Sequence, residues 1–247
     1  MSSLVWTCWR WAATSDSSDD ANVSYDHAAA LSLALEMVST VSSLLARPSI
    51  QDRFMNHWHA ASQLEADEGI IMANAPKSVR RVEQGAIDTG IRVQTRFFHV
   101  ESDYYSWSLE RRMLRMCAPS IHHLCKTLFF ENTRYEEKEG HDLLVQYTGK
   151  LNSQKLTNYV RGLSNGTKKG FNLRVASEAE SDSFTGYKTG GVTPLGMARK
   201  VPVILCEAIT RLQPCVFWMG AGHLDWKVAV PVDAFVRGTG CFVVDLE

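Results

Sequence analysis

The chain has 247 residues, of which 45% are hydrophobic and 21% are charged, and its formal net charge is −1. This composition fits a globular protein with a substantial core. No run approaches the ~20 apolar residues of a membrane span and the N-terminus lacks a secretory signal pattern, so we expect a cytoplasmic protein with no membrane partner.

The net charge of the chain is near zero, but the charges are distributed unevenly between an acidic N-terminal segment and a basic remainder of the chain. Residues 1–77 carry four basic and nine acidic residues, whereas residues 78–247 carry 22 basic and 18 acidic ones. A mildly basic body is compatible with a nucleic-acid partner, although interspersed surface charge gives the same balance.

The N-terminal part predicts a helical extension, residues 1–76, ahead of the main domain, residues 77–247. Residues 1–25 combine three tryptophans with a polar acidic stretch that we expect to be disordered. An Ala/Leu-rich helix is predicted over 27–47, and a second helix follows with Ile50, Phe54, Trp58, Ala61 and Leu64 on one face. This hairpin either packs on the main domain or binds a partner, and both alternatives remain open.

The main domain begins with a helix after Pro76, a strand over 91–100 and a helix over 107–117 that carries Arg111 and Arg115 on one face. Residues 122–132 show a strand pattern in which Lys126 shares a face with Leu124, Leu128 and Phe130. A lysine within an apolar strand face is costly unless it meets a cleft or an anion, so Lys126 is a candidate functional residue. A lysine that extends into solvent from a sheet edge is the alternative.

The remaining pattern mixes strands and helices without strict alternation. Strands are expected at 143–148, 171–175, 201–205, 215–219, 227–230 and 241–246, and helices at 152–163, 177–185 and 231–237. The prediction is an α+β fold with a mixed, curved β-sheet and surrounding helices.

A glycine-rich loop follows Gly186 and contains Gly190, Gly191, Pro194 and Gly196. Glycines permit positive φ and close approach of the backbone to a ligand, while Pro194 stiffens the chain. An ordinary surface turn is the alternative reading of the same residues.

The sequence gives little indication of a metal site or of disulfide bonds. Six scattered cysteines form no C-x-x-C pair, which predicts reduced structural thiols. The clusters His57-x-His59 and His122-His123-x-Cys125 have no matching second ligand pair, so we expect no metal and no cofactor. A metal hydrolase built on these four histidines remains the weakest alternative.

Several motifs, in order, resemble the YbaK/prolyl-tRNA-synthetase-associated editing domain. They are Lys126-Thr-Leu-Phe129, the strand at 143–148, Gly186-Tyr with Gly190-Gly-Val-Thr-Pro-Leu-Gly196, Val201-Pro-Val, and Gly220-Ala-Gly-His223. The resemblance covers about residues 78–247, and the forms SDYYSW and HLCK are similar to a eukaryotic branch of the family.

The resemblance implies hydrolysis of mischarged aminoacyl-tRNA by a free-standing protein acting in trans, with tRNA as partner and a small amino acid such as Ala or Cys on tRNA(Pro) as substrate. Synthetases are the partners expected for the extension. The catalytic residues that it implies are Lys126, Gly190, Gly191 and Gly196, and the substrate-binding residues are Thr193, Pro194, Gly220, Gly222 and His223. One departure is Cys206, which stands beside Glu207 where the family often has an acidic residue.

Physically, such a site needs to position a water and stabilise an oxyanion on an already labile ester. Backbone N–H groups of residues 190–196 are the expected donors, and Lys126 is expected to supply a point charge. No nucleophile–base set is recognisable in the sequence, so we expect no covalent acyl intermediate. A catalytically weak tRNA- or synthetase-binding module is the second functional hypothesis.

Overall fold

The computed structural model describes residues 74–133, 142–163 and 172–247, together with Val38, Asp52, Met55, Asn56, Trp58 and residues 60–64. The predicted leader (1–25) and most of the predicted first helix (27–47) lie outside these residues. Among the described residues, no helix has both the length and the apolar character needed to cross a membrane.

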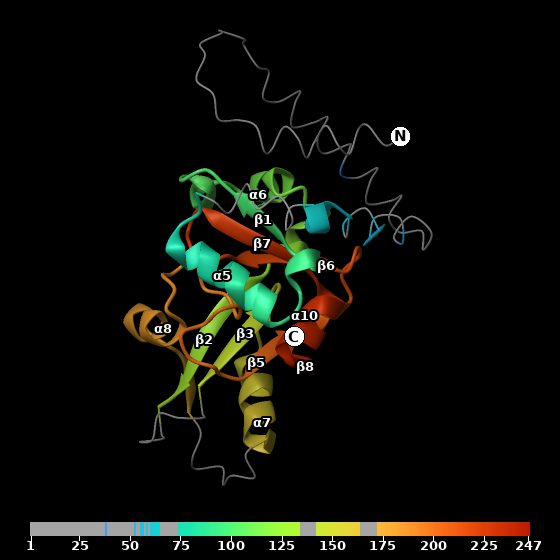
Figure 1. Cartoon of the computed structure of the whole chain (residues 1–247). Coiled ribbons are helices and arrows are strands. Elements are labelled where there is room, and N and C mark those ends of the chain that lie inside the picture. Colours follow the sequence, from blue (N-terminus) through green and yellow to red (C-terminus); the bar gives the residue numbers. More distant parts are fainter. Residues whose placement is uncertain are drawn as a thin grey trace.

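The expected α+β class is confirmed, but the strands form two sheets rather than one (Figure 1). The first sheet is antiparallel, in the order β1 (Arg96–His99), β7 (Trp226–Pro231) and β6 (Val216–Gly220). The second is mixed, in the order β4 (Leu173–Val175), β2 (Lys126–Asn132), β3 (Leu143–Tyr147), β5 (Val203–Cys206) and β8 (Phe242–Val244). In it β2 pairs antiparallel with β3 and β4, whereas β3–β5 and β5–β8 are parallel pairs.

The helices lie around the two sheets and between their strands in sequence. They are α5 (Lys77–Asp88), α6 (Leu109–Arg115), α7 (Ser153–Leu163), α8 (Glu178–Thr185), α9 (Glu207–Thr210) and α10 (Val232–Thr239). Short 3₁₀ turns occur at η1 (Arg92–Gln94), η2 (Tyr104–Ser106) and η3 (Ile121–His123). Two expected strands therefore start later than predicted, because η1 and η3 occupy their first residues.

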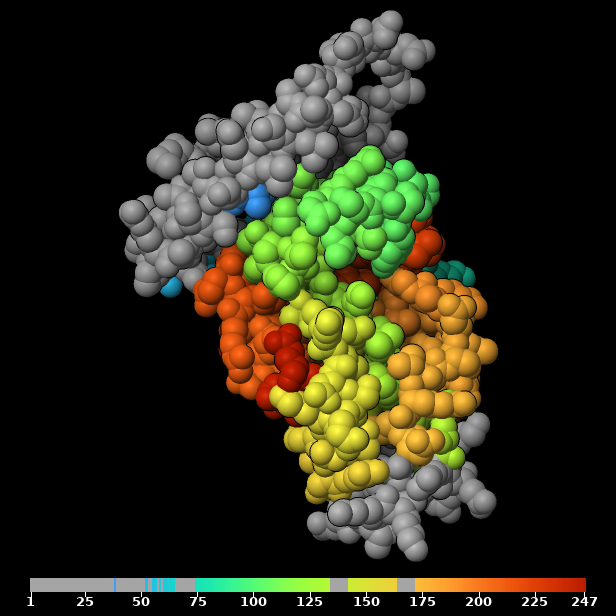
Figure 2. All heavy atoms as spheres, turned by 180° about the vertical axis from the view of Figure 1, so that it is seen from behind, coloured from blue at the N-terminus to red at the C-terminus, as the bar shows by residue number. Residues whose placement is uncertain are grey.

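The helix ends follow local chemistry that the sequence displays. Ser177 and Glu180 form a capping box at the start of α8, and Gly186 ends that helix with φ +72°. The side chain of Asn152 accepts from the N–H groups of Gln154 and Lys155 at the start of α7. The C-terminal residues lie against α7, where Asn152 N–H donates to Leu246 O and Lys155 pairs with Asp245 (Figure 2).

Two apolar clusters cover opposite faces of the mixed sheet. Residues of β2, β3 and β5, including Phe130, Val145 and Ile204, pack with Leu156 and Val160 of α7. A larger cluster joins α5, the glycine loop, β6, β7 and α10, and Leu205 of β5 and Cys125 contribute to it from the other face.

The described part of the predicted second helix packs on the main domain. Trp58 is 3% exposed, its indole N–H donates to Gln94 O at 2.8 Å, and its ring meets Trp218 edge-on. Leu64, which was expected on the same apolar face, is instead 47% exposed. A partner for residues 1–76, and a domain boundary after residue 76, stay predictions.

Candidate functional site

The glycine loop, residues 186–196, is held closed by a buried tyrosine. The hydroxyl of Tyr187 lies 2.7 Å from Leu195 O and 2.8 Å from Gly196 O, so the start of the loop is bonded to its end. Arg81 of α5 stacks over the Tyr187 ring at 4.1 Å and donates to Gly186 O at 2.6 Å. Burial of Tyr187 raises the pKa of its phenol, which keeps this hydroxyl protonated as a donor.

The glycines of the site allow backbone to lie directly on backbone. A Cβ on Gly191 would stand 2.7 Å from His223 N, and one on Gly220 would stand 2.7 Å from Val192 O. Gly222 donates its N–H to Gly191 O at 2.8 Å, and a Cβ on Gly222 would stand 2.6 Å from Ser78 O of α5. These glycines are therefore required by packing between the loop, the β6–β7 turn and α5, whether or not a ligand also approaches them.

The amide groups of the loop divide into bonded and available donors. The N–H of Gly191 donates to Lys188 O at 2.9 Å, so this predicted catalytic residue has no free amide in the structure. By contrast, the N–H groups of Gly190, Val192 and Gly196 donate to no described residue. Gly190 and Val192 are also partly exposed, so their amides are the better candidates for oxyanion donors, whereas the backbone N of Gly196 lies against Gly85 of α5.

The three predicted substrate-binding side chains differ in exposure. Thr193 and Pro194 are buried, and the Thr193 hydroxyl faces the Met219 sulfur at 3.6 Å, inside the protein. His223 is partly exposed in the β6–β7 turn, where its Nδ1 accepts from Asp225 N–H at 3.2 Å. Only His223 of these three presents a polar side chain to solvent.

Lys126 begins β2 at the junction between the two sheets. Leu124 pairs in parallel with Trp218, and Cys125 N–H donates to Trp218 O at 2.9 Å. Lys126 and Gly220 each lie two residues beyond this bridge, and Gly220 in turn lies against Gly191 and Val192. The backbone of Lys126 is thus brought to the strand end on which the glycine loop packs.

The Lys126 side chain is exposed, not enclosed by an apolar face as the sequence pattern had indicated. It makes no hydrogen bond or ion pair with any described residue. It leaves the sheet on the face of Leu128 and Phe130, which pack toward α7, whereas Cys125 packs on the face of the glycine loop. A role for its ammonium opposite the loop amides remains a prediction.

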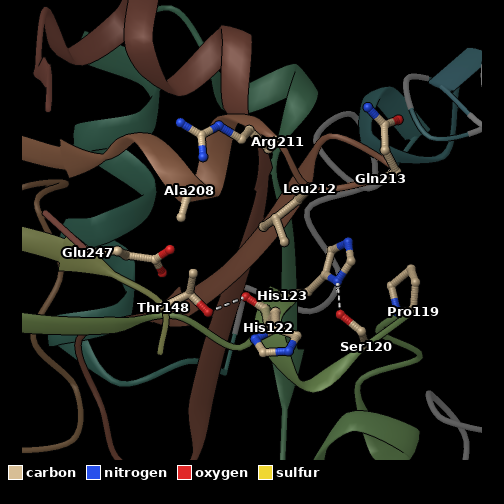
Figure 3. A pocket seen from close by; sticks show the side chains of 10 residues that line it. All are labelled: Pro119, Ser120, His122, His123, Thr148, Ala208, Arg211, Leu212, Gln213 and Glu247. Carbon is tan, nitrogen blue, oxygen red and sulfur yellow. Dashed lines mark hydrogen bonds between the residues drawn. The ribbon is translucent and has the colours of Figure 1, made fainter. Parts of the chain in front are cut away.

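A pocket of about 390 Å³ lies on another part of the surface (Figure 3). Its lining includes Ser120, His122, His123, Thr148 and Arg211, and none of the catalytic or substrate-binding residues that the resemblance implies. Within it the Ser120 hydroxyl lies 2.8 Å from Nδ1 of His123, which resembles a nucleophile–base pair.

The environment of His123 makes it a poor base. Its Nε2 lies 3.2 Å from Pro214 O, which only accepts, so Nε2 carries the proton and Nδ1 accepts from Ser120. Burial lowers the pKa of His123 to about 4, against hydrogen bonds that raise it. The pair therefore holds η3 against the segment before β6.

The alternative metal site gains no ligand set among the described residues, where no group of three or more His, Cys, Asp or Glu side chains could hold an ion. His57 and His59 lie outside the described residues. The five described cysteines are free thiols.

Two contacts of the loop were missed by sequence reasoning. The hydroxyl of Tyr105 donates to Gly190 O at 2.9 Å, and Arg81 binds Gly186 and Tyr187. Tyr105 stands in the segment SDYYSW and Arg81 in the helix expected after Pro76, but 85 and more than 100 residues separate them from their partners. Nothing in the local pattern indicates such distant contacts.

Solved structures share this fold at low sequence identity. A candidate trans-editing enzyme for prolyl-tRNA synthetase is 21% identical with a TM-score of 0.58, and the match covers 70% of this chain and 99% of that one. A scaffold from a study of epitope backbone grafting is 18% identical, with a TM-score of 0.56 and coverage of 70% and 98%. The hypothetical protein APE2540 is 19% identical, with a TM-score of 0.52 and coverage of 67% and 98%.

No curated protein matches the sequence. The profile of the aminoacyl-tRNA editing domain matches residues 111–237, which include β2 with Lys126, the whole glycine loop and the β6–β7 turn. The match spans more than half of the chain and agrees with the resemblance seen in the motifs, and the chain therefore belongs to the aminoacyl-tRNA editing domain family.

Proposed function

We propose that this protein is a trans-editing hydrolase that removes a wrongly attached small amino acid, Ala or Cys, from tRNA(Pro). The observation that carries the proposal is the rigid glycine loop, in which the N–H groups of Gly190 and Val192 donate to no described residue. The proposal adds the ammonium of Lys126, an exposed side chain at the start of β2 that bonds no described residue. The similar solved structure of a candidate trans-editing enzyme for prolyl-tRNA synthetase supports tRNA(Pro) as the tRNA in this proposal.

In this mechanism water attacks the ester carbonyl and the carbonyl oxygen becomes an oxyanion. The loop amides stabilise it, and one such donor typically contributes about 10²–10³ in rate. Collapse of the intermediate releases the free amino acid and returns a proton to the terminal ribose hydroxyl. The Lys126 ammonium acts as a point charge on a nearby phosphate or on the carbonyl oxygen.

Rejection of the correct prolyl ester requires a site that excludes the larger ring. A missing or additional methylene discriminates only about 10–200-fold, so the difference between Ala and Pro must also use the ring shape. The tight packing at Gly191, Gly220 and Gly222 leaves the loop little freedom to widen, which supports exclusion by size.

The test is a panel of tRNA(Pro) charged with labelled Ala, Cys, Ser, Thr or Pro and scored for first-order loss of label. We expect the protein to hydrolyse Ala- or Cys-tRNA(Pro) well above the rate in buffer and to leave Pro-tRNA(Pro) intact. Lys126→Ala is expected to abolish the reaction, whereas Lys155→Ala, which removes an exposed ammonium of α7, is expected to retain it.

Three results would contradict the proposal. Stable binding of every charged tRNA without hydrolysis would favour the binding module. If the protein neither hydrolysed nor bound any tRNA of the panel, tRNA(Pro) would not be its substrate. If Lys126→Ala and the wild type hydrolysed the mischarged tRNA at equal rates, Lys126 would have no role in catalysis.

A further inference from the structure

Tyr105 connects a distant turn to the glycine loop through one hydrogen bond. It is the second tyrosine of the SDYYSW segment and lies in η2, and its hydroxyl donates to Gly190 O at 2.9 Å. At Gly190 the chain has φ +84°, a conformation that residues with a side chain rarely adopt, so glycine is favoured there.

This bond completes the fixing of two successive peptide units. The carbonyl of Gly190 is bonded by Tyr105 and the N–H of Gly191 by Lys188 O, while the carbonyl of Gly191 accepts from Gly222 N–H. A peptide between two glycines rotates readily, since glycine populates positive and negative φ about equally. Tyr105 removes that freedom on the carbonyl side of the Gly190–Gly191 peptide.

Tyr105 is itself held in place before any ligand binds. Arg112 of α6 donates to Tyr105 O at 3.2 Å and to Trp107 O at 3.0 Å. The ammonium of Lys227 lies 4.7 Å from the centre of the Tyr105 ring and donates to Leu224 O at 2.5 Å, within the β6–β7 turn. A cation over an aromatic ring is attracted by its quadrupole, and here it is largely desolvated.

The available amides lie directly on either side of the peptide unit that Tyr105 fixes. They are the N–H groups of Gly190 and Val192, which donate to no described residue. A change in ψ of Gly190 or in φ of Gly191 that the other angle does not compensate would turn one neighbouring peptide plane relative to the other, and the Tyr105 bond opposes such a change.

We propose that Tyr105 is a positioning residue for deacylation, which holds the Gly190–Gly191 peptide so that the Gly190 and Val192 amides stay directed at the ester carbonyl. The proposal rests on the proposed function and deepens it. Tyr105 acts through the loop, since its hydroxyl is bonded to the protein backbone and not directed at the reacting atoms.

The test compares Tyr105→Phe with Tyr159→Phe under single-turnover and steady-state conditions on the mischarged tRNA that the wild type hydrolyses. Tyr105→Phe removes the hydroxyl and keeps the ring over Lys227. We expect kcat to fall about tenfold or more, with KM within about twofold, because the lost contact affects only stabilisation of the transition state. Tyr159 lies on α7 and its hydroxyl bonds no described residue, so Tyr159→Phe is expected to keep the wild-type kcat.

The assay is run well below the melting temperature of each variant, which is measured in parallel. An unchanged kcat for Tyr105→Phe would overturn the inference while leaving the proposed function intact. A higher KM at constant kcat would also overturn it, since Tyr105 would then contact the tRNA itself. An inactive wild type would instead count against the proposed function.

Discussion

Gly85 of α5 lies directly against Gly196 at the end of the glycine loop. A Cβ placed on Gly85 would fall far inside the 3.0 Å that Cβ atoms keep from other atoms, and its nearest neighbours would be the N and Cα of Gly196. Both partners in this contact are backbone atoms, so no side chain can rotate away. The helix and the loop can touch only because neither residue has a side chain.

We therefore expect Gly85→Ala to destabilise the protein, although alanine is normally favoured over glycine in a helix by about 1 kcal/mol. The loop would have to move away from α5, which would also disturb the Arg81 contacts and lower deacylation. Urea unfolding and the tRNA assay measure the two effects.

The matched control is Gly162→Ala in α7, where a Cβ would meet nothing within 4 Å. Here the ordinary helix propensity applies, and stability is expected to rise by up to about 1 kcal/mol without a change in activity. If Gly85→Ala were as stable as Gly162→Ala, the close packing of the loop on α5 would be wrong.

The sequence predicts those features that depend on near neighbours in the chain. The helix expected over 177–185, which ends at Gly186, and the strands expected at 215–219 and 227–230 depend on local sequence, and all are confirmed. The position of the glycine loop was likewise readable from its composition.

Features that depend on distant segments were not predictable. Gly191 is required by the backbone of Gly222 and His223, in a segment distant in sequence. Gly220 is required in the same way by the backbone of Gly191 and Val192, whereas the sequence pattern had suggested close approach to a ligand. Likewise the strand pattern around Lys126 gave its face correctly but could not show that the strand begins there, at the edge of the apolar region, because η3 depends on contacts with the segment before β6.

The Ser120–His123 pair gives a prediction about acid stability. His123 has a pKa of about 4 in the folded protein and an ordinary value near 6.5 when unfolded. Between these values the unfolded chain binds more protons, so the contribution of His123 to stability is full above pH 6.5 and is lost as the pH falls toward 4. The limiting slope is about 1.4 kcal/mol per pH unit.

His123→Gln keeps a donor for Pro214 O and removes the titration. We expect this variant to be less stable at neutral pH and to lose less stability than the wild type between pH 6.5 and 4, measured by urea unfolding. Other groups, including the neighbouring His122, are present in both proteins and cancel in the difference. Parallel stability curves for the two proteins would contradict the assignment.

A variant of Ser120 distinguishes direct attack by water on the ester from nucleophilic attack by the Ser120 hydroxyl. If Ser120 formed an acyl intermediate, Ser120→Ala would abolish deacylation, whereas a structural Ser120 predicts a rate within about threefold of the wild type. Loss of activity with an intact fold would move the site to the pocket of Figure 3.

Trp58 offers a test of how the described part of the predicted second helix is held. Its side chain is buried among Val100, Met113 and Trp218, and its indole N–H bonds Gln94 O at 2.8 Å. Trp58→Ala removes this contact and leaves a cavity, for which the usual cost is about 3–5 kcal/mol when the surroundings do not collapse. We expect a lower unfolding midpoint and faster proteolysis within residues 1–76.

Leu64→Ala, at an exposed position of the same segment, is the control and is expected to change neither the unfolding midpoint nor the rate of proteolysis. Unchanged proteolysis of Trp58→Ala would mean that other residues hold the extension on the main domain.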